Sequence, residues 1–249
     1  MILSLQHIMS YKTAFFLVIV SLFLGDLIIP VVSTIIYQVS SGIPGWTLYE
    51  FILFQGTLII VVGLWHTFFA DLLGETIGSI EAGEFDKILL RPFNALAFMT
   101  SNSFDPEGLA EILAGTLIVL FALIKMNLFT VFLLVYVLII ILATLFEYAL
   151  TIIAAALAFT FVKTWRLFEF ISIVEKFSRY PLEVYTMPLR FVLTFIIPAA
   201  IAAYYPASIL LGKQALITTL WVAIPVLIFF TFSLWLWSVA IKKYSSAGG

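Results

Sequence analysis

Long apolar runs separated by short polar intervals dominate this 249-residue chain. Several runs approach 20 residues, the length at which an α-helix spans the hydrocarbon core of a bilayer, which is roughly 30 Å thick. Inside lipid the backbone N–H and C=O groups find no water, so these runs are expected to be helices. The pattern predicts an all-α, polytopic membrane protein with a single transmembrane domain over residues 1–249.

Six crossings are expected, and five of them have clear limits. Before the third, Asp105 is a suitable N-cap residue and Pro106 fits the first helical position. The fourth run would be about 51 Å long as one helix, so that helix either protrudes from the membrane or tilts and bends. The five clear runs cover about 13–37, 47–69, 109–125, 128–161 and 214–241.

The remaining crossing, fifth in order, has two readings. Hydropathy places it at about 190–212 and leaves 167–189 as a cytoplasmic amphipathic stretch. In the alternative, residues 167–182 form a short crossing that holds four charged residues, and prolines break the chain after it into helices that dip into the membrane and return. Both readings put the two termini on the same side. The charged residues are Glu169, Glu175, Lys176 and Arg179, and the prolines are Pro188, Pro198 and Pro206.

Lysine and arginine residues indicate the orientation, because cytoplasmic loops carry an excess of both. With a cytoplasmic N-terminus, most of them lie inside. Both termini and the polar interval at about 70–104 are therefore expected in the cytoplasm, in a multi-pass protein of the cell's inner (plasma) membrane. The inside group is Lys12, Lys87, Arg91, Lys163, Arg166, Lys242 and Lys243; Lys125 and Lys213 lie outside, and Lys176, Arg179 and Arg190 depend on the fifth crossing.

The segment EAGEFDKILLRPFNA, residues 81–95, contrasts with a chain that is 63% hydrophobic and only 10% charged. Its residues Phe85, Ile88 and Leu89 share one face of a helix, which Gly83 can begin and Pro92 can end. The segment is either an interfacial loop or a docking ridge for a cytoplasmic protein. Its charged residues are Glu81, Glu84, Asp86, Lys87 and Arg91.

Two carboxylates, Asp26 and Glu147, fall at membrane depth, where ionisable residues are costly and usually functional. They are candidates either for a proton or ion relay or for hydrogen bonds between helices. Neither has a second carboxylate one or two turns away on its own helix. His7 and His66 are far apart and the chain has no cysteine, which argues against a transition-metal site.

Other function classes find no support in the sequence. A net charge of −2 gives no reason to expect a nucleic-acid partner. The Gly-Lys pair at 212–213 lacks the rest of a phosphate-binding loop, and no hydrolase or metalloprotease motif is present. The chain is therefore not expected to be an enzyme or to bind ATP itself.

Two motifs in order suggest a family. A G-[ED]-[FL]-D-x-x-L-L-R-P-x-N pattern precedes a helix start of the form D-x-x-G-L-x-x-x-L-x-G, and a YP…iP…yPa…llG pattern precedes the last run. Together these stretches resemble the permease subunits of ABC type-2 exporters. The matches are Gly83, Glu84, Phe85, Asp86, Leu89, Leu90, Arg91, Pro92 and Asn94; Asp105, Gly108, Leu109, Leu113 and Gly115; and Tyr180, Pro181, Pro198, Tyr205, Pro206 and Gly212.

The resemblance implies the six-helix type V exporter fold, with a cytoplasmic coupling helix inside the 70–104 segment and re-entrant helices at about 183–212. It favours the short fifth crossing, with Glu175 and Arg179 in or near the membrane. It also implies a partner ATPase dimer, which would bind ATP and Mg, and a second permease subunit, either identical or a sister chain. The expected extracellular gate comprises Tyr180, Pro181, Pro198, Tyr205 and Pro206.

The expected function is ATP-driven export of a hydrophobic or amphipathic substrate. In a coupling helix, Phe85, Ile88 and Leu89 would seat in a cleft of the ATPase, and the charged residues around them would orient the contact. The rival hypothesis is an ion-coupled secondary transporter that uses Asp26 and Glu147 and needs no ATPase.

Overall fold

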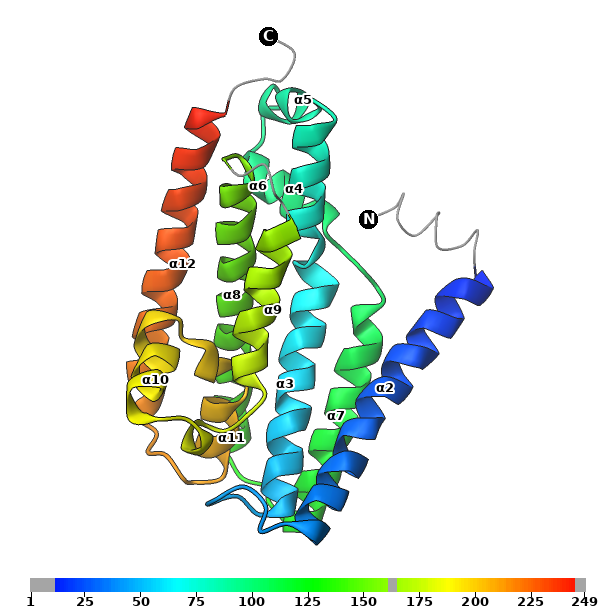
Figure 1. The fold of residues 1–249 in the computed structure, drawn as a ribbon, viewed down its shortest axis with the longest axis vertical. Coiled ribbons are helices and arrows are strands. Elements are labelled where there is room, and N and C mark those ends of the chain that lie inside the picture. Colours follow the sequence, from blue (N-terminus) through cyan, green and yellow to red (C-terminus); the bar gives the residue numbers. More distant parts are fainter. Residues whose placement is uncertain (1–11, 161–164, 245–249) are drawn as a thin grey trace.

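A bundle of long helices forms the body of the molecule (Figure 1). The computed structural model describes residues 12–160 and 165–244, and the regular structure in these ranges is helical. Five segments are long and apolar enough to cross a membrane, which confirms the predicted fold class. They are α2 (Lys12–Val39), α3 (Leu48–Phe68) with α4 (Asp71–Glu81), α7 (Gly108–Met126), α8 (Phe132–Ala158) and α12 (Thr218–Lys243).

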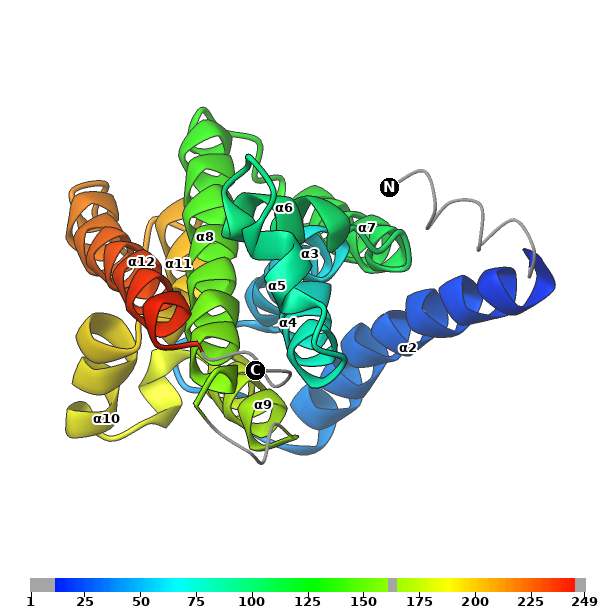
Figure 2. The same cartoon turned by 90° about the horizontal axis from the view of Figure 1, so that it is seen from above.

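Helices α3 and α7 pack closely along their length because glycines let their backbones approach. A Cβ atom on Gly63 of α3 would lie 2.7 Å from the backbone nitrogen of Ile112. A Cβ atom on Gly115 of α7 would lie 2.8 Å from the carbonyl oxygen of Gly56. By contrast, the N-terminal part of α2 leans away from the bundle (Figure 2). No residue in the most apolar stretch of α2 is buried.

The 70–104 interval folds into short helices at one end of the bundle, as the amphipathic pattern predicts. After α4 come α5 (Phe85–Leu89) and α6 (Ala95–Asn102). Gly83 separates α4 from α5 with a φ of 66°, a conformation that suits glycine. The α5 helix ends at Leu89, ahead of Pro92, and the Asn94 side chain caps α6 by accepting the Ala97 N–H at 3.1 Å.

The structure favours the second reading of the fifth crossing, because residues 190–212 form several short pieces and not one helix, whereas α9 (Trp165–Ser178) is one continuous helix. Figure 1 shows α9 returning the chain from the α5 end toward the opposite end, where α12 begins. Its 14 residues span about 21 Å, less than the hydrocarbon core. Because α9 is short and carries charged residues, its length and hydropathy do not mark it as a membrane span, although it lies within the bundle.

Residues 182–210 form a succession of short helices toward the end opposite α5 (Figure 1). Prolines stand at the starts of these pieces: Pro188 is the second residue of one of them, Pro198 directly precedes another, and Pro206 lies in the first turn of the last. The predicted interruption by proline is therefore confirmed. The pieces are η1 (Leu182–Val184), α10 (Met187–Phe191), η2 (Val192–Ile196), η3 (Ala199–Ala202) and α11 (Tyr204–Leu210).

The described basic residues divide between the two ends much as the sequence predicts. Lys87 and Arg91 lie at the α5 end together with Lys242 and Lys243, the last residues of α12. The opposite end has Lys125, in the last turn of α7. Lys213 lies there too, just after α11. Lys163, which the sequence assigns to the first group, lies outside the described residues.

Candidate functional site

The α5 helix does not present the face that the sequence predicts. Phe85 is fully buried within this chain, and Ile88 is buried as well. The Phe85 ring lies 4.8 Å from the ring of Phe159, just after α8, and 5.2 Å from that of Tyr244, just after α12. Phe85 and Ile88 therefore hold α5 on the bundle and are not available to a partner protein.

A different set of apolar side chains is exposed at this end. Leu90 is 85% exposed, Phe93 is 71% exposed and Leu89 is 41% exposed. We call Leu89, Leu90 and Phe93 the α5 ridge. Neighbouring large apolar side chains that are exposed to solvent are typical of a contact site for another protein. Sequence periodicity missed Leu90 and Phe93 because they follow the last helical residue.

Charged residues surround the α5 ridge. Lys87 and Glu84 form an exposed ion pair, 3.0 Å between Nζ and Oε1. The Arg91 guanidinium lies 4.2 Å from the centre of the Phe98 ring of α6, so Arg91 makes a cation–π contact within this chain. Among the other predicted coupling residues, Glu81 and Pro92 are exposed and Asp86 is half-buried. The arrangement is a small apolar patch with charged groups on its sides.

The carboxylates at membrane depth have neighbours that sequence spacing could not show. Glu147 of α8 is 1% exposed, and neither of its oxygens has a hydrogen-bond partner among the described residues. Its interhelical hydrogen bond, one of the two roles predicted, is therefore not formed. Glu147 interacts electrostatically with the carboxylate of Glu175 on α9, and Asp26 does so with the carboxylate of Glu111 on α7.

A cavity of about 540 Å³ brings several of these groups together. Asp26, Glu111, Glu175 and Arg179 line it, from α2, α7 and α9 and the residue after α9. Most of the other lining residues are apolar side chains of α2 and α3. Glu147 is not among the lining residues. Three of the four intramembrane polar residues predicted from the sequence thus share one cavity, and Glu111 joins them without having been predicted.

His66 connects α3 to the start of α7. Its Nδ1 lies 3.1 Å from Glu111 Oε1, and its Nε2 lies 3.4 Å from Asp105 Oδ2. The contact with His66 holds the pKa of Asp105 below its usual range. Asp105 also accepts the Glu107 N–H at 2.9 Å, so it caps a turn that precedes α7 and not, as predicted, the helix itself. Among the described residues, no group of three or more His, Cys, Asp or Glu side chains is arranged so that it could hold a metal ion.

The residues assigned to an extracellular gate lie in and before the short helices. Tyr180 is 51% exposed and lines the cavity. Pro181, Pro198 and Pro206 are buried. Tyr205 is buried, and its hydroxyl lies 3.1 Å from that of Thr194. Four of the five side chains therefore pack the short helices together, and Tyr180 alone among them lies at an opening.

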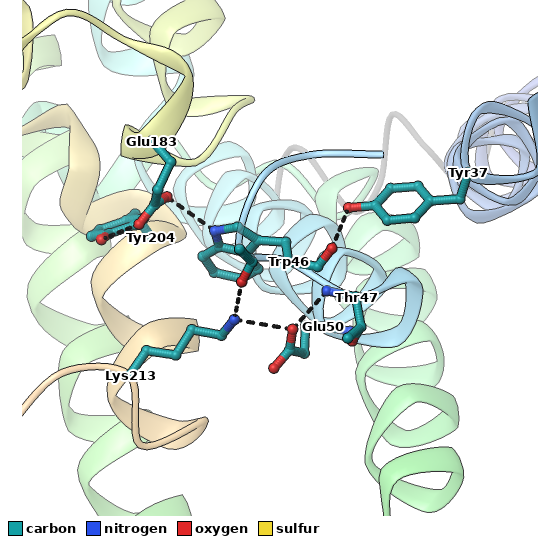
Figure 3. A network of polar contacts seen from close by, with 8 residues as sticks. Tyr37, Trp46, Thr47, Glu50, Glu183, Tyr204 and Lys213 are labelled. Carbon is teal, nitrogen blue, oxygen red and sulfur yellow. Dashed lines mark hydrogen bonds and ion pairs between the residues drawn. The ribbon is translucent and has the colours of Figure 1, made fainter. Parts of the chain in front are cut away.

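A polar cluster that the sequence did not reveal joins these short helices to the α2–α3 connection (Figure 3). The Trp46 indole N–H and the Tyr204 hydroxyl donate to the two oxygens of Glu183, at 3.0 and 2.8 Å. The Lys213 ammonium donates to Glu50 at 3.0 Å and to the carbonyl of Gly45, and lies 4.7 Å from the Trp46 ring. We call Trp46, Glu50, Glu183, Tyr204 and Lys213 the Trp46 cluster.

The Trp46 cluster is anchored on both of its sides. Glu50 completes a capping box with Thr47 at the start of α3, and Tyr37 of α2 donates to the Trp46 carbonyl at 3.1 Å. Burial, together with the Glu183 carboxylate, raises the pKa of the Tyr204 hydroxyl. The cluster fixes how the 182–213 region sits on α2 and α3.

Comparison with known families identifies the family of this chain. Residues 23–248 match the family described as ABC-2 family transporter protein. Comparison with curated proteins and with solved structures gave no match. The match covers almost the whole chain, including the α4–α6 end, the cavity and the Trp46 cluster. Together with the membrane-spanning helices, it shows that this integral membrane protein belongs to the ABC-2 transporter family and is one of its permeases.

Proposed function

We propose that this permease is the transmembrane subunit of an ATP-driven exporter and that it docks a separate ABC ATPase through the α5 ridge. The observation that carries the proposal is the exposure of Leu90 and Phe93 on a segment that is itself pinned to the bundle. An apolar surface at a polar end gains free energy when a partner covers it. A loop with no partner would gain nothing from exposing these side chains.

The burial of Phe85 gives the mechanism of coupling. Its ring packs between Phe159 and Tyr244, next to the ends of α8 and α12. Since packed interiors transmit displacement and do not absorb it, a shift of α5 reaches α8 and α12 directly. When the ATPases close on ATP, the α5 ridge moves with them, and the long helices change which side of the membrane the transport path opens to.

The remaining parts of the transporter lie on other chains. ATP binds with Mg to the ATPase dimer and is hydrolysed there, and this chain contributes no group to the hydrolysis. A second permease, identical or a sister chain, completes the membrane unit. The chain sits in the inner (plasma) membrane with both termini and the α5 ridge in the cytoplasm, an orientation supported by Lys87, Arg91, Lys242 and Lys243 at the α5 end.

The proposal is tested by purifying the tagged chain from its native cells in mild detergent. An ATPase with phosphate-binding motifs should co-purify with the wild-type chain. The double variant Leu90→Glu/Phe93→Glu should lose it, because each buried apolar side chain is worth roughly 1.5–3 kcal/mol of binding. The matched control is Phe129→Glu/Val131→Glu in the connection between α7 and α8, outside the membrane spans, with side chains 63% and 73% exposed. If the ATPase is absent, or remains bound to the ridge variant, the proposal is wrong.

A further inference from the structure

The cavity between α2, α3 and α9 has the dimensions of a small-molecule site. Its volume of about 540 Å³ lies within the roughly 300–1,000 Å³ that ligand pockets occupy. It lies at mid-height, since Asp26 is near the middle of α2 and Leu58 near the middle of α3. Such a position suits a molecule on its way through the bundle.

The wall of this cavity combines two kinds of surface. Ile29 and Val32 of α2 face it together with Leu58 and Ile59 of α3, so a large part of the lining is apolar. The charged part is three carboxylates, from Asp26, Glu111 and Glu175, against the guanidinium of Arg179. Arg179 is exposed, whereas the three carboxylate residues are partly buried. A positive group inside the cavity would therefore meet mainly negative charge.

Two oxygens of these carboxylates are buried without a partner. Asp26 Oδ2 and Glu111 Oε2 have no hydrogen bond among the described residues. The other oxygen of Glu111 is held by His66, which fixes the carboxylate in place. A buried acceptor without a donor costs free energy that a bound ligand can recover. An anion would be repelled here, and an inorganic cation would leave the apolar wall unused.

We propose that this cavity binds a lipophilic organic cation, a molecule with one positive charge and an apolar body, and that such cations are the cargo. The second half rests on the proposed export function. The positive group pairs with Asp26 and Glu111, and the apolar body lies along α2 and α3. The Arg179 guanidinium, on the exposed side of the cavity, repels the positive group and so favours its pairing with the carboxylates.

The test uses two ions of the same shape and opposite charge, tetraphenylphosphonium and tetraphenylborate. Equilibrium dialysis with the purified permease in detergent measures the saturable binding of each. The wild-type chain should bind tetraphenylphosphonium and show no saturable binding of tetraphenylborate. Asp26→Asn and Glu111→Gln should each weaken tetraphenylphosphonium binding by about tenfold or more, because a unit charge acts strongly at a partly buried site. Arg179→Gln should strengthen it.

Two further variants separate loss of the site from loss of the fold. Glu75→Gln removes a carboxylate on the exposed side of α4 and should leave binding unchanged. Val32→Trp adds volume to the apolar wall without changing charge and should weaken binding. Each variant must elute as the wild-type does and retain its melting temperature, and Glu111→Asp serves in place of Glu111→Gln if the latter unfolds.

Three results would overturn the inference: no saturable binding of the cation, equal binding of both ions, or binding that is insensitive to Asp26→Asn and Glu111→Gln. None of these results depends on the ATPase. A chain that co-purifies with its ATPase but fails this test would retain the proposed function and lose this cargo. A chain that binds the cation but has no ATPase would retain the binding site and lose the proposed export function.

Discussion

At the scale of single residues, Phe85 and Leu90 have different roles: Phe85, which the sequence predicts to dock a partner, anchors α5 on the bundle, and Leu90, outside the predicted face, is exposed. Both are large and apolar and lie five positions apart, yet Phe85 is fully buried and Leu90 is 85% exposed. Periodicity correctly marks Phe85 as facing an apolar surface. It cannot tell whether that surface belongs to a partner or to Phe159 and Tyr244, which are 74 and 159 residues away along the chain.

We predict that Phe85→Ala and Leu90→Ala have opposite effects in two measurements. Phe85→Ala should lower the free energy of unfolding by about 3–5 kcal/mol, because it leaves a cavity among aromatic rings, and this should appear as a lower melting temperature. Leu90→Ala should leave the melting temperature unchanged and weaken ATPase binding in a pull-down titration. Equal melting temperatures for the two variants would show that Phe85 does not anchor α5.

The Trp46 cluster makes a second prediction at this scale. The side chains of Lys213 and Glu50 are only 26% and 20% exposed, so Lys213→Met removes the counter-ion of a largely buried carboxylate, which keeps the Thr47 N–H as a donor. The expected loss is about 1–3 kcal/mol of unfolding free energy, measured by thermal unfolding in detergent. Lys125→Met is the control at the same end. The Lys125 ammonium lies 5.8 Å from the ring of Phe121 on the same helix, so this contact joins no separate segments. Identical melting curves for the wild-type and Lys213→Met proteins would contradict the role given to the cluster.

At the scale of elements, apolar length predicted the five long crossings, and proline positions predicted the broken segment after α9. The α9 helix itself could not be found by hydropathy, because Glu169, Glu175 and Lys176 lower its average while neighbouring helices shield part of its surface. The cavity escaped prediction for a related reason. Its carboxylates lie on three different helices, so no spacing along one helix connects them.

The α3–α7 contact gives a prediction about packing. Gly115→Ala should destabilise the protein by about 1–3 kcal/mol, because the added methyl group would meet the Gly56 carbonyl and the Ile60 nitrogen at 2.8 Å. Gly78→Ala is the matched control, since it adds the same methyl group to a helix where nothing lies within 4 Å. The comparison is made by thermal unfolding. A Gly115→Ala protein as stable as Gly78→Ala would show that the two backbones can separate at little cost.

At the scale of the whole molecule, the path of the chain predicts which surfaces face each side of the membrane. Because the chain has no cysteine, single cysteines can be introduced and labelled with a membrane-impermeant maleimide. Met187→Cys, at a position 85% exposed at the start of α10, should react in intact cells. Lys87→Cys should react only after the membrane is opened. Labelling of Met187→Cys only after opening would return α10 to the cytoplasm and restore the hydropathy reading.

The central claim, that the α5 ridge docks an ATPase, is tested most directly by photo-crosslinking in living cells. A photoreactive amino acid replaces Leu90, and Leu220 of α12 is the control position. The account predicts an adduct from Leu90 that contains a protein with ATP-binding motifs, and no such adduct from Leu220. An adduct lacking any ATPase, or equal ATPase adducts from both positions, would contradict it.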